Sequence, residues 1–366
     1  MKVLAVVPDG NALDILRIHS EWNPELEWHI IGIRPNAAEE PGEWIESVAH
    51  LRIDDRKLID RPPGPFPLDT FCQYERAYHE HRSPFIIHYW EYDPVIVEQG
   101  CSILQKQMTA MLPVDVIVTW GERGWYNEVA IDFAEAHGLP VCRLERAAFP
   151  GMLVADGTGL EQSRCDLSLW HSEDINEYRS SLGQYELEQL IQWLSVAIWQ
   201  NIEPQERTTA GMVNKLLDGR PSIFVPMQVP FDTNMIFRAN QQNNFTMLEH
   251  VAEKYPDHRV LVKMHPADRF SDKHNVAAYC ADHGWEYTDC GSHALIEAVD
   301  KIVSINSQCI IEAWMHDTPV EILGQPAFDL PEEEDKEALL YTLRFAYYIE
   351  PWQLTERLRW ISSRCA

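Results

Sequence analysis

The stretch that decides the fold runs from residue 221 to residue 266 and contains two short apolar runs. The first is Ser222-Ile223-Phe224-Val225-Pro226, and the second is Arg259-Val260-Leu261-Val262-Lys263-Met264. Between them, residues 243–254 have the apolar spacing of a helix. The order strand, helix, strand is the repeating unit of an open parallel sheet. We therefore expect these runs to form two neighbouring parallel strands.

Polar residues follow each of the two runs. Gln228 and Asp232 come after the first, and the pair His265-Pro266 comes directly after the second. In open parallel sheets, ligands bind beyond the carboxyl ends of the strands. The sequence therefore predicts a ligand site at this edge of the sheet, with Asp232 and His265 on neighbouring strands.

The same alternation extends over the rest of the chain. Apolar runs predict further strands at 3–7, 28–33, 50–53, 114–120, 140–144, 285–287, 301–305 and 319–324. Helical spacing falls between these runs, at 11–22, 93–112, 128–137, 208–217, 272–283, 292–299, 332–347 and 353–362. Residues 151–159, with three glycines, are expected to form a loop that includes Asp156. The fold class predicted by this pattern is α/β.

The length of 366 residues exceeds what one ordinary core accommodates and favours two domains. Glu203-Pro204-Gln205-Glu206 is the expected linker. We expect Rossmann-like domains at 1–202 and 207–366, facing each other across a cleft, with the last helices in the second domain. Sugar transferases, dehydrogenases and two-domain binding proteins share this layout, so the fold alone leaves the function open.

Charge and cysteine usage exclude some classes of function. The net charge is −27, from 57 acidic and 30 basic residues, which disfavours nucleic acid and anionic membrane surfaces as non-specific partners. No apolar run approaches the roughly 20 residues of a membrane helix. The N-terminus has the pattern of a buried strand rather than of a signal peptide. The eight cysteines show no C-x-x-C pair, which favours reduced thiols and a cytoplasmic protein.

Three features of the second half suit an anionic ligand. His265, beside Pro266, and Lys263 can donate to a phosphate, although a histidine at a strand end often makes only a structural bond. Asn306 and Ser307 precede a predicted helix, whose N-terminus attracts phosphate, although both are also ordinary helix caps. Further along this helix, the carboxylate of Glu312 can accept from ribose hydroxyls, or it lies on a solvated helix face.

Three carboxylates are candidates for catalysis. Asp232 lies in a polar loop after a strand, where it either acts on an anomeric carbon or simply shapes a turn. Glu145 lies at the carboxyl end of a predicted strand, and Asp156 lies in the expected glycine-containing loop. Either one can serve as acid or base. We rank Glu145 above Asp156 because strand ends carry the active sites of parallel sheets.

Taken in order, these motifs resemble the capsule polysaccharide family of KpsC and KpsS, and the Kdo-transferring module of WbbB is the nearest match that we identify. The resemblance covers roughly residues 114–329. The motifs that carry it are Glu145 before Phe149, Gln228 with Asp232, Lys263 with His265-Pro266, and Ser304-x-Asn306-Ser307 with Glu312. The sequence departs from the family at Arg146-Ala147, where an acidic residue and a glycine are usual, and this departure leaves the acid/base residue open.

The resemblance implies a GT-B fold and a retaining enzyme that transfers Kdo, an acidic sugar, from CMP-Kdo and forms a β linkage. The first domain would then bind the acceptor and the second the donor. The implied donor-binding residues are Gln228, Lys263, His265, Pro266, Ser304, Asn306, Ser307 and Glu312. The implied catalytic residues are Asp232 with Glu145 or Asp156.

The resemblance also implies the partners of the enzyme. They are CMP-Kdo and a lipid-linked polysaccharide acceptor, such as O-antigen or capsule, reached at the inner face of the inner membrane through other modules or proteins. No cofactor and no metal ion are expected, since the single phosphate of a CMP donor is satisfied by His265, Lys263 and a helix N-terminus. Two alternatives remain: transfer of another CMP-activated acid sugar such as sialic acid, and a non-catalytic protein that binds sugars.

Overall fold

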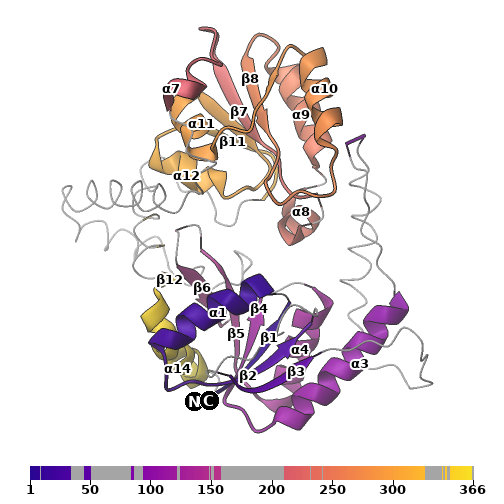
Figure 1. Ribbon diagram of the computed structural model, residues 1–366, viewed down its shortest axis with the longest axis vertical. Helices are drawn as coiled ribbons and strands as arrows, with labels where there is room; N and C mark the ends of the chain where they lie inside the picture. The colour runs from indigo at the N-terminus through magenta and orange to yellow at the C-terminus, as the bar shows by residue number, and fades with distance from the viewer. Residues whose placement is uncertain are drawn as a thin grey trace, which may run out of the picture. The chain divides into compact units, whose positions relative to one another are not determined.

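The computed structural model describes residues 1–8, 10–33, 45–50, 84–85, 94–121, 124–147, 149, 152–157, 210–230, 232–240, 242–325, 340, 343 and 347–364. The chain divides into two compact units. Unit 1 comprises Met1–Phe71, Tyr92–Leu182 and Ala338–Ala366, and unit 2 comprises Cys72–Glu91 and Gly183–Glu337. Each unit is an α/β layer structure built on one sheet (Figure 1).

The sheet of unit 1 has the strand order β12-β6-β5-β4-β1-β2-β3. Its strands are β1 (Lys2–Val7), β2 (Glu27–Gly32), β3 (Ile45–His50), β4 (Val116–Trp120), β5 (Val141–Arg146), β6 (Leu153–Asp156) and β12 (Tyr348–Ile349). The five strands β1 to β5 run parallel, whereas β6 pairs antiparallel with both β5 and β12.

Helices cover both faces of this sheet, because successive side chains of β1 point to opposite faces and are apolar on both. Val3, Ala5 and Val7 face a core shared with α1 (Gly10–Trp22) and α14 (Leu354–Arg364). Leu4 and Val6 face a second core, shared with α3 (Pro94–Met111) and α4 (Trp125–His137). Because both faces are buried, β1 is apolar at nearly every position instead of alternating with polar residues.

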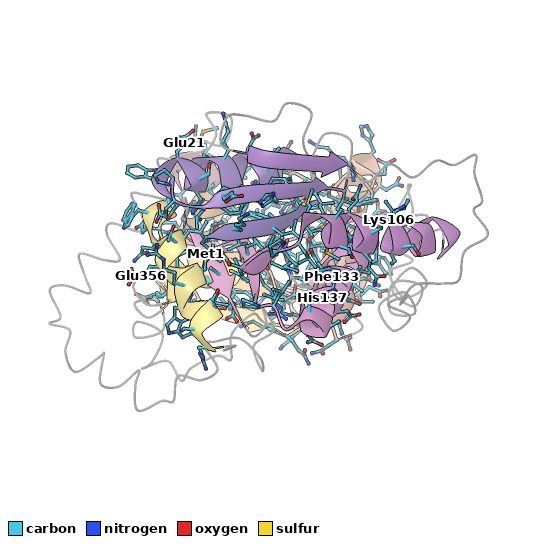
Figure 2. All side chains as sticks on the ribbon, turned by 90° about the horizontal axis from the view of Figure 1, so that it is seen from below. Met1, Glu21, Lys106, Phe133, His137 and Glu356 are labelled. Carbon is cyan, nitrogen blue, oxygen red and sulfur yellow. The ribbon has the colours of Figure 1, made fainter. Side chains whose placement is uncertain are left out.

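Helix α4 ends at a glycine. Gly138 has φ 64°, and its N–H returns to the carbonyl groups of Ala134 and Glu135. This left-handed conformation is accessible to glycine at little cost. In the last turn, the ring of His137 stacks on that of Phe133 with a centroid distance of 4.0 Å; both residues are labelled in Figure 2.

The sheet of unit 2 is entirely parallel, in the order β11-β10-β7-β8-β9. Its strands are β7 (Ser222–Pro226), β8 (Arg259–Lys263), β9 (Glu286–Tyr287), β10 (Lys301–Ser304) and β11 (Val320–Ile322). Its helices are α7 (Ala210–Val213), α8 (Thr233–Arg238), α9 (Asn244–Lys254), α10 (Lys273–Asp282), α11 (Ser292–Ala298) and α12 (Cys309–Met315). In Figure 1, α9 and α10 lie on one side of the sheet and α7, α11 and α12 on the other.

Both faces of this second sheet are also buried. Ile223 and Val225 face the core that includes residues of α8, α9 and α10, while Phe224 faces the core that includes residues of α7, α11 and α12. Phe85 comes from the first half of the chain but packs edge-to-face against Phe245 and Tyr279 of unit 2, and only 2% of its surface is exposed. The predicted α/β class, with Rossmann-like units, is confirmed.

Three local expectations differ from the structure. Residues 153–156, expected in a loop, form β6, because the apolar run Leu153–Ala155 pairs with β5 despite the flanking glycines. A strand that we did not expect lies at Ile45–His50, and of the strand expected at 50–53 only His50 is among the described residues. The helix expected at 208–217 appears as the short α7, which ends at Val213.

The final helix also belongs to a different unit than expected. We placed residues 207–366 in one domain, but α14 packs on the sheet of unit 1. The apolar side of α14 explains this packing, because Leu354, Leu358 and Ile361 are buried in the core of unit 1. Asn23 adds two hydrogen bonds: it donates to the Pro351 carbonyl at 2.6 Å and accepts from the N–H of Thr355 at 3.0 Å. The linker expected at 203–206 and most of the helix expected at 332–347 lie outside the described residues.

Candidate functional site

The carboxyl ends of β7, β8 and β10 bring most of the predicted site residues of unit 2 together. Pro226, the last residue of β7, is in register with Lys263, the last residue of β8, and β10 pairs with the other side of β7. The segments that follow these strands begin with Met227, Met264 and Ile305, so their polar residues gather at one edge of the sheet. This edge is the ligand-binding edge of a parallel sheet.

Two of the predicted donor-binding residues bind each other. The side chain of Gln228 donates from Nε2 to Oδ1 of Asn306 at 2.6 Å, and its Oε1 accepts from the N–H of Asn306 at 3.0 Å. The main chain of Gln228 is held in turn by the side chain of Asn244, in both directions. Gln228 is buried, with 8% of its surface exposed. The two side chains therefore hold the loops after β7 and β10 in place, and direct binding of the donor by this pair stays a prediction.

Asp232 is the N-cap of helix α8. Its Oδ1 accepts a hydrogen bond of 2.9 Å from the N–H of Asn234, the standard N-cap bond. Burial raises the pKa of the Asp232 carboxyl, while the Asn234 N–H and the nearby His265 lower it. The residue is nevertheless exposed, so neighbouring protein displaces part of the water around the carboxyl but leaves it open to solvent. Asp232 thus lies within electrostatic range of His265, and the strands that precede the two residues, β7 and β8, are neighbours.

His265 is exposed in the turn after β8. Its Nδ1 accepts a hydrogen bond of 3.1 Å from the N–H of Ala267, and its carbonyl accepts from the N–H of Asp268 at 2.9 Å. With Nδ1 acting as acceptor, the proton of a neutral ring lies on Nε2. Such a ring is suited to donate a hydrogen bond to an anionic ligand. Pro266 follows it and is exposed as well.

Lys263 lies in a small polar cluster next to this turn. The residue is buried, with 6% of its surface exposed, and its Nζ donates to Oγ of Ser292 at 3.3 Å. Cys309 lies in the same cluster: burial and the nearby Glu312 raise the pKa of its thiol to about 12, while Ser307, Lys263 and Ser292 act in the opposite direction. The structure therefore groups the predicted residues Lys263, Ser307 and Glu312.

Ser292 and Cys309 are members of this cluster that sequence reasoning missed. Ser292 opens helix α11 and Cys309 opens helix α12. The sequence predicts that Ser292 begins a helix and that Cys309 lies in the first turn of another. Such positions are common in parallel sheets and do not by themselves indicate a site. Their contact with Lys263 depends on the packing of α11 beside α12, which no short-range pattern encodes.

Serines shape the turn between β10 and α12. Oγ of Ser304 accepts from the N–H of Ser307 at 3.3 Å, and Oγ of Ser307 accepts from the N–H of Cys309 at 3.2 Å. Ser304 is fully buried. Ser304 is therefore a turn-forming residue, while Ser307 remains at the entrance of the helix, where a phosphate is attracted.

The two other candidate carboxylates belong to unit 1. Glu145 is half-buried on β5 and is in register with Val154 of β6. Asp156 is fully buried at the end of β6, and its Oδ2 accepts a hydrogen bond of 3.0 Å from Tyr347. Asp156 thus has a structural partner, and Glu145 is the better exposed of the two. A catalytic part for either one stays a prediction.

Within the described ranges, no group of three or more His, Cys, Asp or Glu side chains is arranged to hold a metal ion. In the same part of the chain, no helix combines the length and the apolar character that crossing a membrane requires.

A comparison with protein families gives one match. The family described as "Capsule polysaccharide biosynthesis protein" matches residues 169–336. This segment is a little under half of the chain and contains every candidate residue of unit 2. No curated protein sequence matches the chain.

Solved structures with a similar fold include two transferases and an epimerase. The β-Kdo 2,7 transferase of KpsC from Thermosulfurimonas dismutans is 17% identical, covering 70% of this chain and 88% of its own, with a TM-score of 0.43. The β-Kdo 2,4 transferase of the same KpsC is 16% identical over 68% and 87%, with a TM-score of 0.44. The UDP-GlcNAc 2-epimerase from Methanocaldococcus jannaschii is 11% identical over 98% and 100%, with a TM-score of 0.37. At these low scores, no residue role follows from the likeness.

Proposed function

We propose that this protein is a retaining β-Kdo glycosyltransferase that moves Kdo from CMP-Kdo to a bacterial surface polysaccharide. The observation that carries the proposal is the grouping of Asp232, His265, Lys263, Ser307 and Glu312 at the ligand-binding edge of unit 2. The family match over the same segment supports a part in capsule polysaccharide biosynthesis. The choice of Kdo and of CMP rests on the resemblance of the motifs.

In this proposal, the phosphate of CMP binds between His265, Lys263 and the N-terminus of α12. Nε2 of His265 and Nζ of Lys263 donate charge-assisted hydrogen bonds, which are stronger than neutral ones. Ser307 and the dipole of α12 add to the attraction, although a helix of this length contributes modestly. Glu312 accepts from the ribose hydroxyls.

Retention of configuration follows from two successive displacements. A carboxylate oxygen of Asp232 attacks the anomeric carbon of Kdo, the bond from that carbon to the phosphate oxygen breaks, and CMP leaves with the electron pair. The acceptor hydroxyl then attacks the same carbon, displaces Asp232 and gives its proton to a base. Glu145 is our candidate for this base, and Asp156 is the weaker one because it is buried against Tyr347.

The test is turnover of CMP-Kdo, generated in situ, with a panel of short synthetic acceptors. Asp232→Asn is expected to lower turnover by about 100-fold or more, and His265→Ala to lower it less, mainly through donor binding. Asp257→Asn and His274→Ala, which change exposed residues of unit 2, serve as matched controls and should behave as wild type.

Three results would separate the alternatives. Release of CMP and extension of an acceptor by the wild type, lost in Asp232→Asn, support the proposal. Turnover of CMP-sialic acid in place of CMP-Kdo would assign a different donor. A protein that binds polysaccharide, has no affinity for CMP and is insensitive to Asp232→Asn would be a sugar-binding protein.

A further inference from the structure

Helix α8 carries Asp232, and the position of its first turn is fixed through the main chain of one residue. The N–H of Asn234 donates to Oδ1 of Asp232 at 2.9 Å. The carbonyl of Asn234 accepts from Nδ2 of Asn306 at 3.0 Å. Asn234 is therefore held between the candidate nucleophile and the loop that leads to α12.

Asn306 is itself held firmly. It exchanges two hydrogen bonds with Gln228, of 2.6 and 3.0 Å, and Gln228 is fixed through its main chain by Asn244. Gln228 and Asn244 are 8% and 5% exposed. Hydrogen-bonded amides of this kind, two of them buried, rigidify the segments that they join. A continuous series of hydrogen bonds thus runs from α9 through Asn306 to Asp232.

The other end of α8 is also fixed. The carbonyl of Arg238 accepts from the N–H of Gln325 at 2.7 Å. Gly324 permits this contact, because a Cβ at this position would lie 2.8 Å from the Arg238 carbonyl oxygen and 2.7 Å from the side chain of Ile305. Helix α8 is therefore clamped at both ends to the segments that follow β10 and β11.

We infer that Asn306 is a positioning residue for Asp232, acting through Asn234 rather than on the donor itself. This inference rests on the proposed function, in which Asp232 reacts with the sugar. Since Asn306 directly precedes Ser307, the segment that meets the donor phosphate is the segment that fixes the nucleophile. Loss of the Asn306 amide leaves the phosphate contacts in place but loosens the turn that holds the carboxylate.

The experiment measures the protonation of Asp232 directly, in the full-length protein without donor. Protonated carboxyls are coupled to glycine amide with a carbodiimide over a range of pH, and labelling of the peptide with Asp232 is quantified by mass spectrometry. The variants are Asn306→Asp, which replaces the donating Nδ2 by an oxygen of the same size, and Asn306→Ala, which adds no charge. Asn275→Ala, on the exposed face of α10, is the matched control.

We expect the labelling midpoint to move upward by about half a unit to one unit in both Asn306 variants, because the Asn234 N–H bond that favours the carboxylate is weakened. The midpoint of Asn275→Ala should equal that of wild type. In turnover of CMP-Kdo, kcat should fall by about 10-fold while KM for the donor changes by less than about threefold, the pattern of a lost transition-state contact.

An unchanged labelling midpoint in folded Asn306 variants overturns the inference, whatever the change in kcat or in donor affinity. Gln228→Met, one step further from Asp232, gives a smaller upward shift and decides the question if the Asn306 variants do not fold. If the wild type transfers no Kdo but the midpoints move as expected, the proposed function fails while the positioning of Asp232 by Asn306 stands.

Discussion

Tyr347 donates a hydrogen bond of 3.0 Å to Asp156, a residue 191 positions earlier in the sequence, and both residues are buried. The contact lies beside the pairing of β12 with β6, where Tyr348 is opposite Val154. A buried carboxyl that accepts from a tyrosine hydroxyl, at the junction of two strands, has the contacts of a structural residue.

Tyr347→Phe is therefore expected to lower the free energy of unfolding by about 1–3 kcal/mol, because a buried acceptor loses its donor. Urea unfolding followed by circular dichroism measures this loss. Asp156→Asn should also destabilise the protein while leaving turnover per folded molecule within a few-fold of wild type. Loss of turnover by Asp156→Asn without any loss of stability would instead make Asp156 the catalytic base and displace Glu145.

Lys263 is expected to dominate the binding of the donor phosphate. Lys263→Met should weaken the binding of CMP by about 10- to 100-fold, the loss expected for a charge-assisted hydrogen bond. Ser292→Ala should weaken it less, because Ser292 acts by holding the ammonium at 3.3 Å. Calorimetric titration with CMP measures both, and Lys215→Met, an exposed lysine of unit 2, is the control. Equal affinities in all three variants would place the nucleotide elsewhere.

A pair of histidines, His293 buried and His316 half-buried, makes unit 2 sensitive to acid. Nδ1 of His293 lies 3.3 Å from Nε2 of His316; burial lowers the pKa of His293 to about 4 and also lowers the pKa of His316. Each imidazole binds a proton more readily in the unfolded chain, so its contribution to stability is present above pH 6.5 and is lost as the pH falls toward 4.

From pH 7 to pH 5, the stability of the wild type should fall by about 2 kcal/mol through His293 alone. Urea unfolding at the two pH values measures the fall. In His293→Leu the fall should be smaller by about that amount, whereas His274→Leu, which changes an exposed histidine of α10, should retain it. If His293→Leu and wild type lose the same stability between pH 7 and pH 5, His293 is not the responsible group.

Gly324→Ala is expected to disturb the clamp on α8. The added methyl group would lie within 3 Å of Ile305 and of the Arg238 carbonyl, contacts too short to keep, so the stability should fall by about 1–3 kcal/mol. Turnover should fall as well, because α8 carries Asp232. Gly219→Ala provides a contrast: this glycine has a positive φ but no neighbour within 4 Å, so it loses stability without loss of turnover per folded molecule.

The sequence predicts unit 2 well because its signals are local. Apolar runs of strand length, such as Ser222–Pro226, alternate with helices that have clear caps, such as the Asn243 capping box of α9. Parallel strands bring their carboxyl ends to one edge of the sheet. The order of the elements therefore suffices to place Asp232 and His265 after neighbouring strands at the same edge. The way in which the two units face each other stays a prediction.

The contacts that long-range packing decides were not predictable. The pairing of Gln228 with Asn306 joins residues 78 positions apart, and no short-range pattern indicates it. The contact of Lys263 with Ser292 and the packing of α14 on unit 1 are of the same kind. Residue type indicates which groups are polar, whereas only the fold determines how they pair.

The return of residues 338–366 to unit 1 has a consequence for synthesis on the ribosome. The core of unit 1 includes Leu354, Leu358 and Ile361, so this unit is complete only after residue 361 has been synthesised. The described strands of unit 2, by contrast, lie between Ser222 and Ile322 and are available earlier. Nascent chains should therefore acquire a protease-resistant unit 2 while unit 1 still lacks β12 and α14, and the edge of β6 that pairs with β12 stays open until residues 348–349 have been synthesised.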